Sequence, residues 1–89
     1  MDRYKIPVPF APDIAVEVLS PSERAMDVRR RVRDYLRVGS KEVWLLDHAI
    51  GEELVHTPTR IRMLQGTDIL ESGLLPGFSV AVAGLVMNL

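Results

Sequence analysis

The feature that most constrains this chain is a short apolar run with a single carboxylate at its centre. Residues 14–19 are flanked by Pro12 and Pro21, and Glu17 is the only charged residue among them. Proline removes a backbone donor, so this pattern predicts a strand bounded by proline at both ends. Both faces of the strand are largely apolar, as expected for an inner strand that is covered on each side.

A basic helix is predicted directly after this strand. Ser22 is suited to be its N-cap, and Glu23 would lie in the first turn, where a negative charge interacts favourably with the helix dipole. Gly39 supplies a C-terminal stop. Between these ends, apolar residues recur at helical spacing, namely Val28, Val32, Tyr35 and Leu36.

The rest of the chain predicts a meander of short strands. Residues 43–47, 52–57 and 60–64 are strand-like, and Pro58 is expected to break the pairing between the last two runs. A final strand is expected at residues 79–82, followed by a short apolar tail. The order of strand, helix, strand and meander predicts an α/β fold, a mixed sheet with one main helix.

Length and composition narrow the possible functions. With 89 residues, the chain is expected to form one small domain, residues 1–89. Its formal net charge is −1, so any affinity for nucleic acid must come from a local basic patch. The absence of cysteine excludes disulfides and thiolate zinc sites. The longest nearly apolar run, residues 80–87, is too short to span a bilayer, so we expect a cytoplasmic protein without a membrane partner.

Glu17 is the first candidate for a functional residue. A carboxylate at the centre of a strand, followed by a basic helix, is how metal-dependent nucleases present a ligand to a phosphodiester. Asp13 shares the strand face of Glu17, but four residues of extended chain separate them by roughly 13 Å, too far to chelate one magnesium ion. The alternative is structural: Asp13 belongs to a turn, and Glu17 is a half-buried charge paired with an arginine.

The predicted helix carries the only substantial basic cluster in the sequence. Arg31 is the cation expected nearest the strand, placed to hold a phosphate or to stabilise developing negative charge. Arg29 and Arg30 belong to the same cluster, which suits phosphate contacts. The alternative is a solvated ladder of charges, since Asp27 and Arg31 have the i,i+4 spacing of a weak surface pair.

Other polar and aromatic residues give weaker signals. His48 lies at a turn after a strand, and neither His48 nor His56 has a second histidine at metal-ligand spacing. Trp44 lies within an apolar strand, where a core position is more typical than a base-stacking platform. The sequence contains no phosphate-binding glycine loop and no nucleophile elbow. The two histidines and Trp44 therefore indicate no further functional site.

An ordered set of motifs resembles a known family. The chain is similar to the bacterial Uma-two family of restriction endonuclease-like proteins at residues 12–22, at 27–31 with Tyr35, at 39–47 and at 75–78. That family belongs to the PD-(D/E)XK nuclease superfamily. The resemblance covers nearly the whole chain, and the ordered set is specific although each motif alone is weak.

The resemblance implies a restriction endonuclease-like core that binds a divalent ion, Mg2+, and hydrolyses phosphodiesters with metal assistance. Glu17 matches the acidic metal ligand of the second catalytic strand. Arg31 occupies the position of the family's catalytic lysine, and it keeps the charge but stays protonated where a lysine can shift its pKa. DNA is the implied partner, with Arg29 and Arg30 as contacts.

The resemblance also implies a partial domain, truncated at the N-terminus. Family members are usually about twice as long, and the portion before Arg3 or so carries the Pro-Asp strand that supplies the first metal ligand. We therefore expect an incomplete site and no cleavage by this chain alone. The alternative is a non-enzymatic interaction module that pairs through its exposed sheet edge, forming a homo-oligomer or binding another protein. Metal binding would favour the first hypothesis, and dimerisation without metal binding the second.

Overall fold

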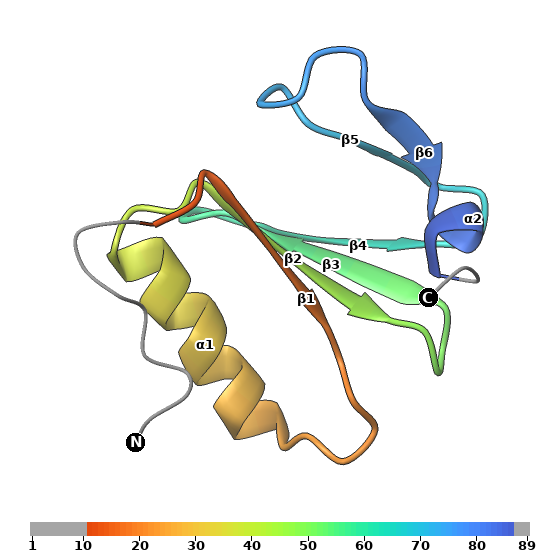
Figure 1. Ribbon diagram of the computed structural model, residues 1–89. Coiled ribbons are helices and arrows are strands. Elements are labelled where there is room, and N and C mark those ends of the chain that lie inside the picture. The colour runs from red at the N-terminus through yellow and green to blue at the C-terminus, as the bar shows by residue number, and fades with distance from the viewer. Residues whose placement is uncertain (1–10, 87–89) are drawn as a thin grey trace.

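The computed structural model describes residues 11–86 as a mixed α/β fold (Figure 1). Its elements are β1 (Ile14–Val18), α1 (Ala25–Arg37), β2 (Glu42–Asp47), β3 (Glu52–His56), β4 (Ile61–Gln65), β5 (Ile69–Glu71), β6 (Ser79–Ala81) and α2 (Val82–Val86). The predicted fold class is confirmed. Among the described residues, neither helix has the length and apolar character needed to cross a membrane.

In the described part of the chain, four strands form the main sheet, in the order β1-β2-β3-β4. β1 and β2 are parallel and are joined through α1, whereas β2, β3 and β4 form an antiparallel meander. β5 and β6 pair separately as a small antiparallel sheet. Because a parallel pair needs a crossover connection, α1 lies over one face of the sheet, and the register places Glu17 beside Leu45 on that face.

The two faces of the sheet carry different cores. On the face toward α1, the buried residues are Ala15, Val32, Val43 and Leu45. On the opposite face, the sheet packs against β5, β6 and α2, drawn in blue in Figure 1, through Trp44, Leu46, Val55, Leu70 and Val82. Trp44 is 5% exposed and its ring lies 5.8 Å from that of Phe78. The prediction that Trp44 belongs to the core is confirmed.

The main helix begins later than the sequence predicts. α1 starts after Arg24, which is the N-cap and makes no side-chain capping bond, so the assignments of Ser22 as cap and of Glu23 to the first turn are wrong. A turn is the reason. The Glu23 N–H donates to the Ser20 carbonyl at 3.0 Å, and the Ser22 N–H donates to Ser20 Oγ at 3.4 Å. Ser22 is therefore part of the turn, and Glu23 lies outside the helix.

Two predictions for the second half of the chain are also wrong. Pro58 does not break the pairing of β3 with β4, because it lies in the tight turn between them, where the Thr57 N–H donates to the Arg60 carbonyl at 2.9 Å. The final strand ends at Ala81, and the chain continues as α2, where the sequence predicts only an apolar tail. β5 has three residues, too few to show the alternation that identifies a strand.

β1 is an edge strand in the described part of the chain, which contradicts the prediction of an inner strand covered on both faces. It pairs with β2 alone. Val16 and Val18, on the face away from α1, are 54% and 48% exposed. Ala15 and Glu17, on the face toward α1, are buried and half-buried. The helix-side face of β1 is therefore covered, whereas on the other face Ile14 alone packs against the core, among the described residues.

Candidate functional site

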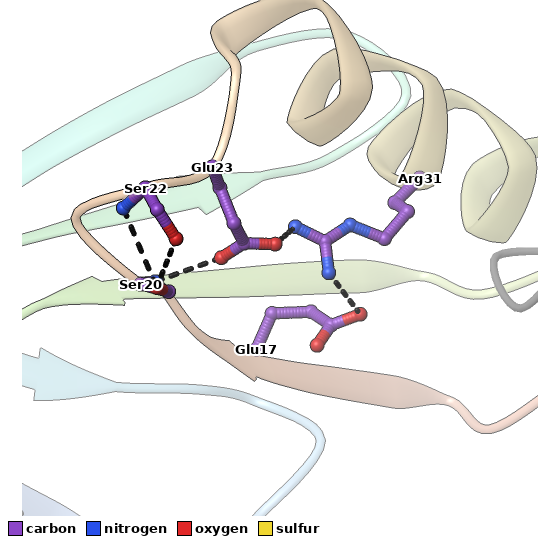
Figure 2. Close-up of polar contacts among 5 residues, drawn as sticks. All are labelled: Glu17, Ser20, Ser22, Glu23 and Arg31. Atoms are coloured by element: carbon purple, nitrogen blue, oxygen red, sulfur yellow. Dashed lines mark hydrogen bonds and ion pairs between the residues drawn. The ribbon is translucent and has the colours of Figure 1, made fainter.

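Glu17 and Arg31 meet on the face of the sheet that α1 covers. Glu17 comes from β1 and Arg31 from the middle of α1 (Figure 2). Glu17 Oε1 lies 4.0 Å from Arg31 Nη1, and the two side chains are only 24% and 12% exposed. The expectation that Arg31 is the cation nearest the strand agrees with this contact. The geometry suits both the functional hypothesis and the structural alternative of a half-buried ion pair.

A second carboxylate completes this group. Glu23, from the turn before α1, forms a hydrogen-bonded ion pair with Arg31 through its Oε1. Its Oε2 accepts a hydrogen bond from the Ser20 N–H at 2.7 Å, and the hydroxyls of Ser20 and Ser22 lie 3.0 Å apart. The Arg31 guanidinium thus joins carboxylates from two separate segments, as Figure 2 shows.

Tyr35 adds a hydroxyl to the same edge of the helix. It follows Arg31 by four residues, so both side chains lie on one side of α1. Burial raises the pKa of the Tyr35 phenol, and Glu17 raises it further as a neighbouring charge and hydrogen-bond acceptor, while Arg31 acts in the opposite direction. The phenol therefore stays protonated and is a potential donor to the Glu17 carboxylate.

The other predicted site residues lie outside this group. The exposed carboxylate of Asp13 is 4.0 Å from Lys41 Nζ, and the Asp13 carbonyl accepts backbone bonds from Lys41 and Glu42. These contacts support the structural interpretation of Asp13. Arg29 and Arg30 are both exposed on α1, and of the two only Arg29 lines a groove between α1 and the β3–β4 turn.

The carboxylates can be compared with what a magnesium ion requires. The described residues contain no group of three or more His, Cys, Asp or Glu side chains that could hold a metal. Glu17 and Glu23, however, are hard oxygen donors that already converge on one cationic group, the Arg31 guanidinium. Magnesium often takes only one or two carboxylates and completes its shell with water and phosphate oxygens. The pair therefore fits part of a magnesium site, and does not fit a site built from protein ligands alone.

Sequence reasoning missed Glu23 and Tyr35 as members of this group. Tyr35 carried a usable signal, since its four-residue spacing from Arg31 places both on one helix edge. Glu23 carried none. Its contact with Arg31 depends on the turn from Ser20 to Glu23, and periodicity along the chain does not reveal such a turn.

Comparison with known proteins agrees with these motifs. The model of the Uma-two family, described as "Putative restriction endonuclease", matches residues 2–83. The chain belongs to this family. No curated protein matches this Uma-two chain.

A solved structure supports the fold. The Uma-two chain is similar to the crystal structure of a protein from Anabaena variabilis described as "a putative nuclease belonging to DUF820", with a TM-score of 0.78 and 20% sequence identity. The similarity covers 86% of this chain and 45% of that one, so this chain spans less than half the length of the solved protein. At this identity the match shows a nuclease-like fold.

Proposed function

We propose that this chain carries part of a magnesium-dependent nuclease site, in which Glu17 binds the ion and Arg31 contacts a substrate phosphate. The observation that carries the proposal is the convergence of a strand carboxylate with a largely buried arginine. Arginine presents several N–H donors in a planar fork, which matches the oxygens of a phosphodiester. Membership of a family described as restriction endonucleases makes DNA the expected substrate, and Arg29 and Arg30 are the further contacts that the sequence suggests.

Glu17 would hold the ion, with Glu23 as the second carboxylate. Such an ion, when bound, activates water and neutralises charge on the phosphodiester. The chain's own residues position these groups: β1 fixes Glu17, and the Ser20 N–H orients Glu23. Arg31 offsets the repulsion between the two carboxylates, and Tyr35 is placed to donate to Glu17.

The described residues supply few ligands for catalysis. Two carboxylates leave most of a magnesium shell to water and phosphate oxygens, and Arg31 does not lose its proton as a lysine at that position can. We therefore expect the chain on its own to bind magnesium weakly and to show no specific cleavage.

Magnesium titration by calorimetry tests the role of Glu17. We expect weak binding that is lost in Glu17→Gln and retained in Asp13→Asn, a control that removes a carboxylate outside the group. Equal binding by Glu17→Gln and the unmodified chain would exclude Glu17 as a ligand. A plasmid-cleavage assay tests the incompleteness of the site, because robust cleavage that disappears in Glu17→Ala would show that the chain needs no further ligand.

A second proposal is that β1 mediates self-association, which is the interaction-module hypothesis in structural terms. The outer edge of β1 is unpaired in the described part of the chain, and Val16 and Val18 are about half exposed beside it. Pairing two copies edge to edge would form backbone hydrogen bonds and cover both valines. Glu17 faces α1, so such pairing would leave the Glu17–Arg31 contact in place.

A further inference from the structure

A basic groove lies along the edge of α1 opposite to Arg31. It runs between the helix and the turn that joins β3 and β4, with Arg29, Arg33 and Arg37 on the helix and Arg60 on the turn. No acidic residue is among the described residues that line it, although the formal net charge of the chain is −1. Positive charge is therefore concentrated in this groove.

The helix arginines form a regular row. Successive members are four residues apart, which corresponds to about 6 Å along an α-helix and about 12 Å for the whole row. A nucleic-acid strand advances about 3.4 Å per phosphate in a duplex, so the length of the row corresponds to about three to four such steps. Arg37 is bonded to Asp34, but this pair is 73% and 29% exposed and holds Arg37 only weakly. Arg60, on the opposite wall, would contact the same backbone from the other side.

The floor of the groove is apolar. Val32 and Leu36 of α1 and Ile61 of β4 form it. Ile61 is 63% exposed, because the core beneath α1 involves β1, β2 and β3 and leaves the helix-side face of β4 uncovered. A single strand has base faces free to cover such a surface, whereas a duplex hides them by stacking. An apolar floor between the helix arginines and Arg60 therefore favours a single strand.

The groove continues toward the candidate site. It adjoins a second depression, and the two share Arg29, Val32 and His56. The second depression reaches Ser20 and Glu23, in the turn that binds Arg31. Burial lowers the pKa of His56, so this residue is neutral where the two depressions meet. A strand lying in the groove and continuing into the second depression would thus reach Glu23, whose carboxylate binds Arg31.

We infer that this groove binds single-stranded nucleic acid, with phosphates on Arg33, Arg37 and Arg60 and bases against Ile61. The inference rests on the proposed nuclease function only in treating the bound strand as the substrate. It assigns no phosphate contact to Arg30, which lies outside the groove.

Fluorescence anisotropy with the full chain and a labelled single-stranded DNA of about 12 nucleotides tests this inference. The buffer contains EDTA and no divalent metal, so binding is measured independently of the proposed metal site. We expect the triple variant Arg33→Gln, Arg37→Gln and Arg60→Gln to bind at least about tenfold more weakly, with a salt dependence reduced by about 2 in its logarithmic slope. Ile61→Ser should weaken binding without changing that slope.

A matched triple variant is the control. Arg24→Gln, Lys41→Gln and Arg62→Gln remove the same charge at exposed positions outside the groove, and this variant should lose less than about threefold in affinity. Equal losses in both triples would overturn the inference in favour of diffuse attraction. The inference would also be overturned if the chain bound a duplex of the same sequence more tightly than the single strand. The same holds if polyglutamate of the same total charge displaced the labelled strand as well as unlabelled single-stranded DNA does. Strand binding is measured here without a divalent metal, so failure of the metal proposal is seen separately, in the magnesium titration.

Discussion

Glu53 should make the stability of this domain depend on pH. It lies in β3 on the face opposite α1, between Leu46 and Leu64 of the neighbouring strands, and it is 0% exposed. Within the described part of the chain, neither of its carboxylate oxygens has a hydrogen-bond partner. Burial raises the pKa of Glu53 from 4.5 to about 7, against a smaller opposing effect of Arg62.

The sign of the effect follows from proton binding. Between pH 4.5 and about 7, the folded chain keeps a proton on Glu53 that the unfolded chain has lost. The free energy of unfolding therefore falls as the pH rises through this range. At about 1.4 kcal/mol for each pH unit, the loss above this range is about 3 kcal/mol, a large share of the stability of a small domain.

The substitution Glu53→Met tests this, because methionine has a similar shape and no charge. Urea unfolding can be followed by the fluorescence of the buried Trp44 at about pH 5 and about pH 8.5. We expect the advantage of Glu53→Met over the unmodified chain to grow by about 2.5 kcal/mol between these conditions, because part of the loss has already occurred at about pH 5. Glu71→Met, at an exposed glutamate, is the matched control for the substitution itself.

The titration of His56 does not affect this comparison of Glu53→Met with the unmodified chain. Burial lowers the pKa of His56, so its contribution to stability rises with pH, opposite in sign to that of Glu53. It is present in both chains and cancels in their difference. If Glu53→Met and the unmodified chain had parallel pH profiles, or if Glu53→Met were the less stable at about pH 8.5, the account of Glu53 as a desolvated acid would be wrong.

Three further predictions concern the site, the small sheet and the strand edge. Arg31→Ala should lower the free energy of unfolding by about 2 kcal/mol, because it leaves two carboxylates close together in a half-buried place. If the effects of Arg31→Ala and Glu17→Ala were additive in a double-mutant cycle, the proposed coupling between these two side chains would be contradicted. Leu70→Ala should cost about 2–5 kcal/mol in urea unfolding, and Ile69→Ala, at a position that is 47% exposed, should cost much less; similar losses would mean that β5 does not pack as described. The unmodified chain should self-associate in sedimentation experiments and Val18→Lys should shift it toward monomer, whereas a stable monomer at micromolar concentration would exclude pairing through β1.

The strand–helix–strand order and the approach of Arg31 to Glu17 were predictable because both depend on local periodicity. A parallel pair needs a crossover, and the apolar spacing of the helix shows which face it turns toward the sheet. Alternation along β1 then places Glu17 on the same face as Ala15. These steps use residues that are close in sequence, so no knowledge of distant packing is required.

Contacts set by distant segments were not predictable in the same way. Glu52 and Glu53 are adjacent in sequence, and alternation alone does not say which of them is buried. Glu53 is buried because the sheet face that carries it packs against β5, β6 and α2, whose shortness gives no periodic signal. The exposure of Val16 and Val18 likewise depends on which segment packs over their face of the sheet, and the sequence of β1 does not contain that information.

The late start of α1 is what creates the group around Arg31. A helix capped by Ser22 would include Glu23 in its first turn, eight residues before Arg31 and about 12 Å from it along the axis. No ion pair could form over that distance. In the observed structure, Glu23 belongs to a turn closed by its own N–H on the Ser20 carbonyl, and its carboxylate reaches Arg31. The rejected helix start and the unpredicted second carboxylate therefore have the same cause, the hydrogen-bonded turn from Ser20 to Glu23.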